Sequence, residues 1–390
     1  MPPSYPQLPK SRLPRAGWLE KAKQGEVQFA YWVPNVSGGL VITNLPMETE
    51  WSHDANVRYA KAAEETGFAS ALAQTRWFAS YGADHQHEAF TISTHILSRT
   101  DKIHVITACH PGLWLPGVAA KIQATLDVIS NGRTCINVVS GWFKGEFTGY
   151  GEPWLEHTER YRRSEEFIRI MKGMWYEDVF TLYGDFYSYD NAPLLPKPVH
   201  QIPVFQGGNS KDARRMAGRV SDVLFMNGNT NAGWREIIDD AKQAALASDR
   251  DPNELEYGAN CFAIVRDTEE EAVQVLRDII ANADIEAVKG FGEAVKQAGR
   301  SSAERQGMWA NSSFEDLVQY NDGFKSGLIG TPEQVADRIM EIKELGINVI
   351  LCGFLHYDWE LEQFGRRVIP LVREREAARR RGRKQVAIPA

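Results

Sequence analysis

The sequence predicts an α/β fold, a closed (β/α)8 TIM barrel in a single domain. Eight short runs rich in β-branched and aromatic residues recur along the chain, and eight is the number of strands that closes such a barrel. Amphipathic helical stretches separate these runs, and no turn of the Asn-Gly type joins one run to the next, which favours parallel strands over a sandwich. An open doubly wound sheet is the alternative, but the segment VPNVSGGL after the first run lacks the glycine spacing of a dinucleotide-binding turn.

The expected strands lie near residues 30, 72, 105, 137, 205, 225, 261 and 351. Three of the helices between them have clear ends. Asp54 is a candidate N-cap for the helix DANVRYAKAAEET, which Gly67 would end. The stretch ERYRRSEEFIRIMKGMW is a second helix. In the third, TPEQVADRIMEIKELG, Thr331 is the expected cap, Pro332 the first residue and Gly346 the end.

Segments at both ends and one internal segment fall outside the repeating pattern. Residues 1–25 are rich in proline and mixed in charge, so we expect an arm on the surface or on a neighbouring subunit. The barrel domain would span residues 26–376, with an insertion at about 266–328, between strand 7 and helix 8. Because barrel active sites lie at that rim, the insertion is either a lid or a packing or oligomer element. Residues 377–390, with the basic run RRRGRK, are expected to form a solvated tail.

Composition and charge exclude several classes of protein. The formal net charge of −7 argues against a nucleic-acid partner, because phosphate binding requires clustered basic residues. The sequence contains neither a recognisable signal peptide nor a run of about 18 apolar residues, so we expect a cytoplasmic protein with no membrane contact. The cysteines lie far apart within apolar runs, which is typical of buried core residues rather than of a disulfide framework or a zinc site. They are Cys109, Cys135, Cys261 and Cys352.

Common catalytic signatures are missing from the sequence. It contains no GxxxxGK, HExxH, GxSxG or CxxC motif. The segment His85-Gln86-His87-Glu88 has metal-ligating residue types, but its place at an expected helix start favours capping or a surface role, and no metal is expected. A barrel without an evident nucleophile or metal commonly takes its reactivity from a bound cofactor.

Two segments could bind such a cofactor. In VFQGGNSKDARRMAG, Gly207, Gly208 and Ser210 lie where a strand turns into a helix, and free backbone amides there bind phosphate in many barrels. A turn that simply needs glycine explains the same residues. In CINVVSGWFKGEF, the strand ends at Asn137, whose carboxamide could meet the polar edge of a flavin ring, and Trp142 could form a wall.

A helix start downstream carries a further candidate group. His157, Arg160 and Tyr161 lie within its first turn or two, which brings a cation and a phenol toward the rim. This combination suits a phosphate and an adjacent ring. An ordinary helix with surface salt bridges is the alternative.

Together these segments resemble the bacterial-luciferase-like flavin monooxygenases, in the branch that holds alkanesulfonate, pyrimidine and dimethyl sulfone monooxygenases. Within that branch, the dimethyl sulfone enzymes are the most similar. The resemblance covers residues from about 28 to 376. The similar segments taken together are far more specific than any one of them. The similar stretches include FAYWVPNVSGGLV, LDVISNGR, NVVSGWFKGEF, EPWLEHTERYRRSEEFIR, PVFQGGNS and FEDLVQYNDGFKSGLIGTPEQVADRI.

The resemblance implies a luciferase-like barrel in a two-component system. A separate NAD(P)H-dependent FMN reductase would supply reduced FMN (FMNH2), with O2 as the oxidant. An oxygen adduct of the flavin would break a carbon–sulfur bond, so that dimethyl sulfone gives methanesulfinate and formaldehyde. A homodimer or homotetramer is also implied. The alternatives are another substrate of the branch (an alkanesulfonate, a pyrimidine or an aminopolycarboxylate) and a non-catalytic flavin-binding or deazaflavin-dependent barrel.

The same resemblance implies roles for individual residues. Flavin contacts fall on Thr75, Arg76, Ala108, Asn137, Glu146, Arg160, Tyr161, Gly208 and Ser210. Arg76 departs from the pyrimidine branch, which has a lysine at this position. Near the reacting centre, residues of the alkanesulfonate enzymes are replaced here by Asn227, Asn260, Phe262 and Phe354. The loss of an arginine that would pair with a sulfonate favours a neutral sulfone, because a buried unpaired anion is costly.

The expected substrate pocket also includes Tyr31 and Trp142, although packing in the core explains Tyr31 equally well. Gln74, His356 and Trp309 are the candidate catalytic residues, as hydrogen-bond donors to the substrate or to the oxygen adduct. An apolar wall would keep that adduct dry.

Overall fold

The computed structural model describes residues 5, 7–77, 79–300, 309 and 312–386. Parts of the expected arm (1–4 and 6), insertion (301–308, 310 and 311) and tail (387–390) lie outside the described residues. Eight parallel strands close into a barrel in the order β1-β12-β9-β8-β7-β4-β3-β2. They are β1 (Gln28–Val33), β2 (Ser70–Ala73), β3 (His104–Cys109), β4 (Thr134–Val138), β7 (Val204–Gly207), β8 (Val223–Met226), β9 (Glu256–Phe262) and β12 (Val349–Gly353). The predicted barrel and its eight strands are confirmed.

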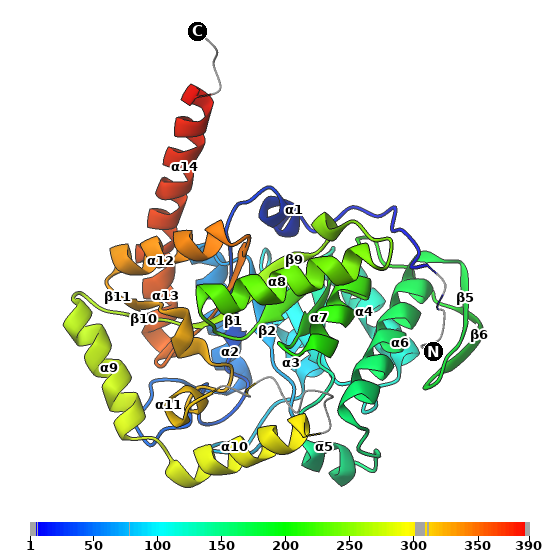
Figure 1. Cartoon of the computed structure of the whole chain (residues 1–390), viewed down its shortest axis with the longest axis horizontal. Coiled ribbons are helices and arrows are strands. Elements are labelled where there is room, and N and C mark those ends of the chain that lie inside the picture. The colour runs from blue at the N-terminus through cyan, green and yellow to red at the C-terminus, as the bar shows by residue number, and fades with distance from the viewer. Residues whose placement is uncertain (1–4, 6, 78, 301–308, 310–311, 387–390) are drawn as a thin grey trace.

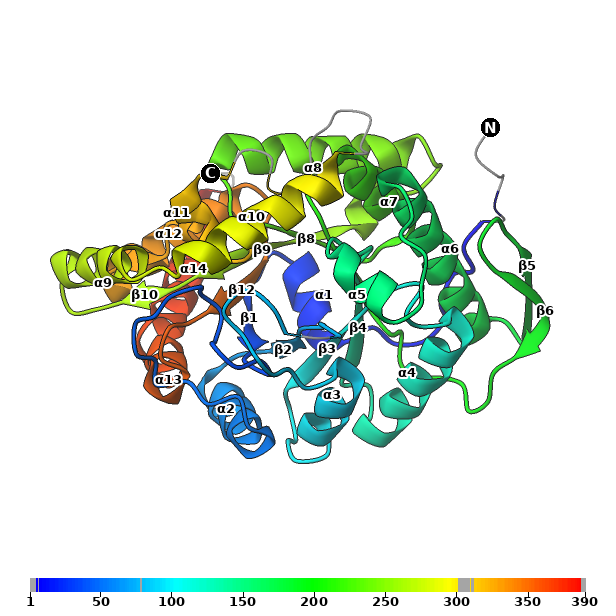
Figure 2. The same ribbon diagram turned by 90° about the horizontal axis from the view of Figure 1, so that it is seen from below.

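Helices surround the barrel on its outer face (Figure 2). They are α2 (His53–Thr66), α3 (Ala89–Leu97), α4 (Pro116–Ser130), α6 (His157–Tyr176), α7 (Lys211–Val220), α8 (Asn231–Leu246), α12 (Pro332–Glu344), α13 (Tyr357–Arg367) and α14 (Ile369–Val386). The strands are buried on both sides, as parallel strands under a helical layer must be. All four cysteines are free and buried, as expected of core residues.

Most of the predicted helix ends are where the sequence placed them. Thr331 caps α12 and Pro332 is its first residue. Gly67, with φ of 102°, ends α2. The cap of α2 is a correction, because Ser52 rather than Asp54 accepts a hydrogen bond from the backbone N–H of Ala55, at 3.2 Å. Asp54 is already helical and lies in the first turn.

Two short pairs of strands were not predicted. β5 (Val179–Tyr183) and β6 (Ser188–Pro193) form an antiparallel hairpin after α6. Glu166 of α6 holds its turn by accepting hydrogen bonds from three consecutive backbone N–H groups, beginning at residue 185. β10 (Ile264–Val265) pairs with β11 (Ile329–Gly330), so the two ends of the insertion meet.

The amino end of the barrel is closed by α1 (Gly17–Lys23). Trp18 is buried and stacks on Phe205 with ring centroids 5.8 Å apart, and it also contacts His104 at the start of β3. This differs from the surface arm expected for residues 1–25, because the helix packs into the barrel's own apolar cluster. The sequence did not predict this short buried helix, because the residues on either side of it are rich in proline and charge.

The insertion contributes α9 (Glu269–Ala281), α10 (Ile285–Gly299), α11 (Phe314–Leu317) and η2 (Gly323–Ser326). α10 crosses the carboxyl end of the barrel near α5 (Lys144–Gly149) (Figure 2). The far end of α14 extends away from the barrel (Figure 1), and residues 377–381 on it are exposed. No helix in the described part of the chain is both long and apolar enough to cross a membrane.

Candidate active site

A cavity opens at the carboxyl ends of the barrel strands. Its polar wall is formed by residues in or directly after five strands. They are Gln74, Thr75 and Arg76 after β2, His110 after β3, Asn137 in β4, Asn227 after β8 and Asn260 in β9. A second, smaller cavity shares Val139, Trp142, Gly207 and Trp309 with the first. The two cavities therefore lie side by side, with these residues between or along both.

The insertion forms the roof of this space. Phe291 of α10, Trp309 and Tyr320 all line the larger cavity. The indole N–H of Trp309 donates to the carbonyl of Tyr320 at 2.8 Å, and its ring makes edge contacts with Trp142 and Phe291. Of the two interpretations left open for the insertion, the lid is the one that these contacts favour.

Most of the sequence-predicted residues lie on the cavities. The larger one is lined by Gln74, Thr75, Arg76, Ala108, Asn137, Trp142, Asn227, Asn260 and Trp309. The smaller one is lined by Trp142, Arg160, Tyr161 and Trp309. Side chains from distant parts of the sequence thus meet at the barrel mouth, where a ligand would contact them together.

Tyr31 and Phe354 are corrections. Both lie outside the cavities, in the layer between strands and helices, where Tyr31 packs on Phe68 and Phe354 packs on Phe68 and Tyr357. Successive side chains on a strand point to opposite faces. In β1 it is Trp32, the next residue, that lines the cavity.

His356 and Phe262 are also absent from the cavity walls of the described structure. The Nδ1 of His356 accepts a hydrogen bond from the backbone N–H of Glu48 at 3.0 Å, and its ring stacks on Trp359. Phe262 packs edge-on against Phe324 of η2. His356 thus holds the start of α13 against the segment after β1, and we do not assign it to catalysis.

A buried electrostatic group lies beside Arg76. The Arg76 guanidinium sits 4.4 Å from the ring centre of Trp142. Glu146 of α5 accepts a hydrogen bond from the backbone N–H of Trp77 at 3.0 Å, and its other oxygen lies 3.8 Å from Nε2 of His110. Burial raises the pKa of Glu146 to about 7, although the positive charge of Arg76 opposes this shift.

His110 is a site residue that the sequence interpretation missed. Its Nδ1 lies 2.8 Å from the carbonyl oxygen of Val139, so Nδ1 must carry the proton and donate it. Burial lowers the pKa of His110 to about 4, and the ring is neutral at pH 7. Its unprotonated Nε2 therefore faces the carboxyl group of Glu146. Its position directly after the third strand could have indicated it as a site residue. The position of Asn137 at the end of the fourth strand indicated that residue in the same way.

The wall of the larger cavity carries buried polar atoms that lack a hydrogen-bond partner in the described structure. They are Gln74 Nε2, Arg76 Nη1, Asn137 Oδ1, Asn227 Nδ2 and Asn260 Oδ1. Buried polar groups are normally paired, and leaving one unpaired costs free energy. Five such atoms around one cavity indicate a polar ligand that both donates and accepts hydrogen bonds.

The smaller cavity suits an anionic group. Arg160 stacks on Trp154 at 4.1 Å and donates to the carbonyl oxygens of Leu155 and Ala298 at 2.7 and 3.0 Å. Tyr161 is hydrogen-bonded to Ser210, which caps the N-terminus of α7. A guanidinium, a phenol and a helix N-terminus together favour a phosphate.

Two further predicted positions can be placed around these cavities. Gly207 rather than Gly208 lines both of them, and Gly208 adopts a φ of 139° at the turn. Glu88 caps α3 by accepting from the backbone N–H groups of Phe90 and Thr91, which confirms the capping interpretation of the segment His85-Gln86-His87-Glu88.

Comparison with known proteins identifies the family. The family described as "Luciferase-like monooxygenase" matches residues 27–348. The chain belongs to the luciferase-like monooxygenase family. This confirms the resemblance inferred from the sequence segments.

Two relatives and one solved structure illustrate the similarity of this luciferase-like monooxygenase to known proteins. An FMNH(2)-dependent dimethylsulfone monooxygenase from Pseudomonas putida is 55% identical over 91% of this chain and 97% of the relative. A protein of the same description from Pseudomonas fluorescens (strain Pf0-1) is 54% identical over 91% of this chain and 96% of its own. A riboflavin lyase crystal structure with modified FMN and riboflavin aligns with a TM-score of 0.77 at 18% identity, over 90% and 92% of the two chains. That likeness shows the fold alone.

Proposed function

We propose that this protein is the oxygenase of a two-component system that uses FMNH2 and O2 to convert dimethyl sulfone to methanesulfinate and formaldehyde. The observation that carries the proposal is the 54–55% identity, over nine-tenths of the chain, to two FMNH(2)-dependent dimethylsulfone monooxygenases. The polar cavity at the barrel mouth supports it with a site of suitable chemistry.

The reaction balances as a monooxygenation. One oxygen atom of O2 enters a C–H bond of one methyl group, and the other leaves as water. The oxidised carbon then departs as formaldehyde while the electron pair of the broken carbon–sulfur bond stays on sulfur as sulfinate. Reduced FMN, when bound, supplies the two electrons and activates O2.

The residues of the site fit a flavin mononucleotide. Asn137 and Arg76 present unpartnered polar atoms that would pair with the carbonyl and N–H groups of a bound flavin ring, and Glu146 lies close to Arg76. Arg160, Tyr161 and Ser210 would hold the phosphate at the smaller cavity. Fixed dipoles and charges of this kind bind and orient a cofactor with little reorganisation.

The remaining wall suits a neutral sulfone. A sulfone has two strong acceptor oxygens and no conventional donor. Gln74 and Asn227 offer unpartnered amide N–H groups after β2 and β8, which lie on opposite sides of the barrel. Apolar side chains complete the wall and can contact the methyl groups while excluding water. They include Trp32, Leu72 and Phe225.

Product analysis tests the proposal. The purified chain, a flavin reductase, NADH, FMN and O2 should release formaldehyde and methanesulfinate in equal amounts from dimethyl sulfone, with catalase present to remove peroxide from free reduced flavin. Methanesulfonate and uracil serve as matched comparison substrates for the other branches. Faster turnover of either one, or NADH consumption without formaldehyde, would overturn the assignment.

The proposal includes a separate NAD(P)H-dependent reductase as partner and a homodimer or homotetramer as the assembly. The support for the assembly is a set of exposed apolar side chains at α4 and β5, of the kind that subunit contacts cover. They include Leu115, Val118, Ile129, Val179 and Tyr183. Light scattering should give the mass of two or four chains, and Ile129→Glu should reduce it if this surface is the contact.

A further inference from the structure

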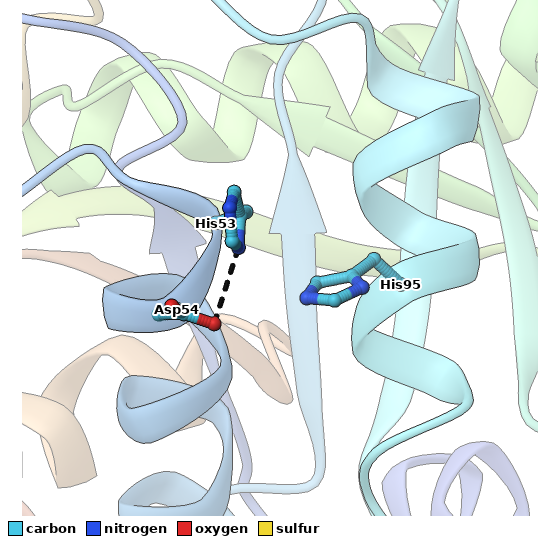
Figure 3. Close-up of side chains that lie close together, drawn as sticks. All are labelled: His53, Asp54 and His95. Carbon is cyan, nitrogen blue, oxygen red and sulfur yellow. Dashed lines mark hydrogen bonds and ion pairs between the residues drawn. The ribbon is translucent and has the colours of Figure 1, made fainter.

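Three side chains with metal-ligating groups converge on the outer face of the barrel, away from the cavities. His53 and Asp54 lie in the first turn of α2, and His95 lies in the last turn of α3 (Figure 3). Each offers one ligand atom, and these atoms lie within 4.8 Å of one another. In Figure 3, one ring nitrogen of His95 points across the gap toward the other two side chains.

The pairwise geometry shows how closely the groups approach. Nδ1 of His53 is 3.2 Å from a carboxylate oxygen of Asp54. The rings of His53 and His95 stand edge-to-face, with centroids 5.4 Å apart and an interplanar angle of 85°. Two imidazoles and one carboxylate thus surround a common point from two different helices.

His95 supplies a second observation. Its Nε2 is out of contact with solvent and lacks a hydrogen-bond partner in the described part of the chain. A buried ring nitrogen normally has a partner, and imidazole nitrogen is the most common metal ligand in proteins. The Asp54 carboxylate is not occupied in capping its own helix, because Ser52 performs that role.

We infer that His53, Asp54 and His95 bind one divalent transition-metal ion, and that zinc is the ion. Imidazole nitrogens with one carboxylate are typical zinc ligands, whereas calcium and magnesium prefer sites built from oxygen. The side chains of His53 and Asp54 are 61% and 80% exposed, so water can reach the ion and complete its coordination.

The ion would act as a clamp between two helices. α2 and α3 flank β2, and the segment between β2 and α3 begins with Gln74, Thr75 and Arg76, which line the larger cavity. A bridge from His53 to His95 would restrict how α3 moves against α2. We therefore expect zinc to raise thermal stability, and not to take part in the oxygenation.

Zinc titration of the full-length chain without an affinity tag tests the inference. After treatment with a chelator, and without flavin, the wild type should bind about one equivalent of zinc by isothermal titration calorimetry. Asp54→Asn, His53→Ala and His95→Ala should each weaken binding at least tenfold. His85→Ala is the matched control, because His85 is an exposed histidine stacked on Trp51, and it should bind zinc as the wild type does.

Two results would overturn the site: no saturable binding near one equivalent, or His95→Ala binding zinc as tightly as the wild type. His95→Gln is a second variant in case the alanine substitution disturbs folding. As an independent measurement, zinc should raise the Tm of the wild type and of His85→Ala, but not of either His95 variant. None of these measurements uses flavin or sulfone, so they stand or fall separately from the proposed oxygenase activity.

Discussion

The two ends of the barrel are built from different kinds of side chain. At the amino end, Trp18 stacks on Phe205 over a cluster of apolar residues contributed by most of the strands. At the carboxyl end, amides and a guanidinium face a cavity and retain unpartnered buried atoms, as Asn137, Asn227 and Arg76 do. The same strands therefore supply packing at one end and a ligand site at the other.

The difference teaches where each kind of substitution should act. Apolar contacts at the closed end are complete in the protein alone, so changes there should alter the free energy of unfolding. At the open end, five buried polar atoms lack a partner in the described protein and would gain one only from a ligand. Changes among them should alter ligand binding while leaving stability nearly unchanged.

Trp18→Ala should produce the largest effect. Loss of a buried tryptophan leaves a cavity under the barrel and should lower the free energy of unfolding by about 3–5 kcal/mol. Urea denaturation measures this change. Trp18→Phe, which keeps an aromatic ring against Phe205, is the control and should recover most of the loss. A cost below about 1 kcal/mol for the alanine variant would mean that α1 does not close the barrel.

Glu146→Gln should change how stability depends on pH. Because burial raises the pKa of Glu146 from 4.5 to about 7, the folded state favours the protonated form. The contribution of protonated Glu146 to the free energy of unfolding is fully present below pH 4.5. It is lost as the pH rises through about 7. The free energy of unfolding of the wild type relative to the variant should therefore fall over that range, by about 3 kcal/mol. Denaturation curves at several pH values test this, and a pH-independent difference would contradict it.

Asn137→Ala should weaken binding of reduced FMN about tenfold, which is about 1.4 kcal/mol. The Tm should stay near that of the wild type, because Asn137 Oδ1 has no partner in the described protein to lose. Anaerobic titration of the chain with reduced FMN measures the affinity. Asn253→Ala, at an exposed asparagine in η1 (Pro252–Glu254), is the control. If Asn137→Ala binds reduced FMN as tightly as the wild type, the flavin does not contact Asn137 and the proposed flavin site is wrong.

Asn227→Ala should have the smallest effect, an increase of about three- to fivefold in KM for dimethyl sulfone with kcat little changed. A neutral hydrogen bond contributes about 0.5–1.5 kcal/mol, and one that is equal in the ground and transition states affects KM alone. Tyr31→Phe is the control, because Tyr31 lies on the outer side of β1. If both variants raise KM equally, the assignment of Asn227 to the cavity and of Tyr31 to the outer side of the barrel is wrong.

The sequence predicted the barrel because strand and helix periodicities survive without knowledge of tertiary contacts. It also predicted Asn137, Arg160 and Tyr161 at the mouth, since polar residues at strand or helix ends stand out from apolar surroundings. These features depend on local pattern, and local pattern is visible in a single sequence.

The failures have a common physical cause. β1 is buried on both faces, so FAYWV shows no alternation that could tell Trp32, on the cavity, from Tyr31, behind it. Likewise, Trp18 lies in a short helix whose burial depends on the amino end of a barrel formed by later residues. To tell which side of a strand faces the cavity, or which helix covers the barrel end, the three-dimensional structure is needed.

The contact between Arg160 and Ala298 joins the wall of the barrel mouth to its roof. The guanidinium of α6 donates to a carbonyl near the end of α10 and still has a buried Nε–H without a partner in the described structure. Because a guanidinium has five N–H donors, an anion can bind it while this contact stays in place. A bound anion and the end of α10 would then be held by the same side chain, so that ligand binding also steadies the roof.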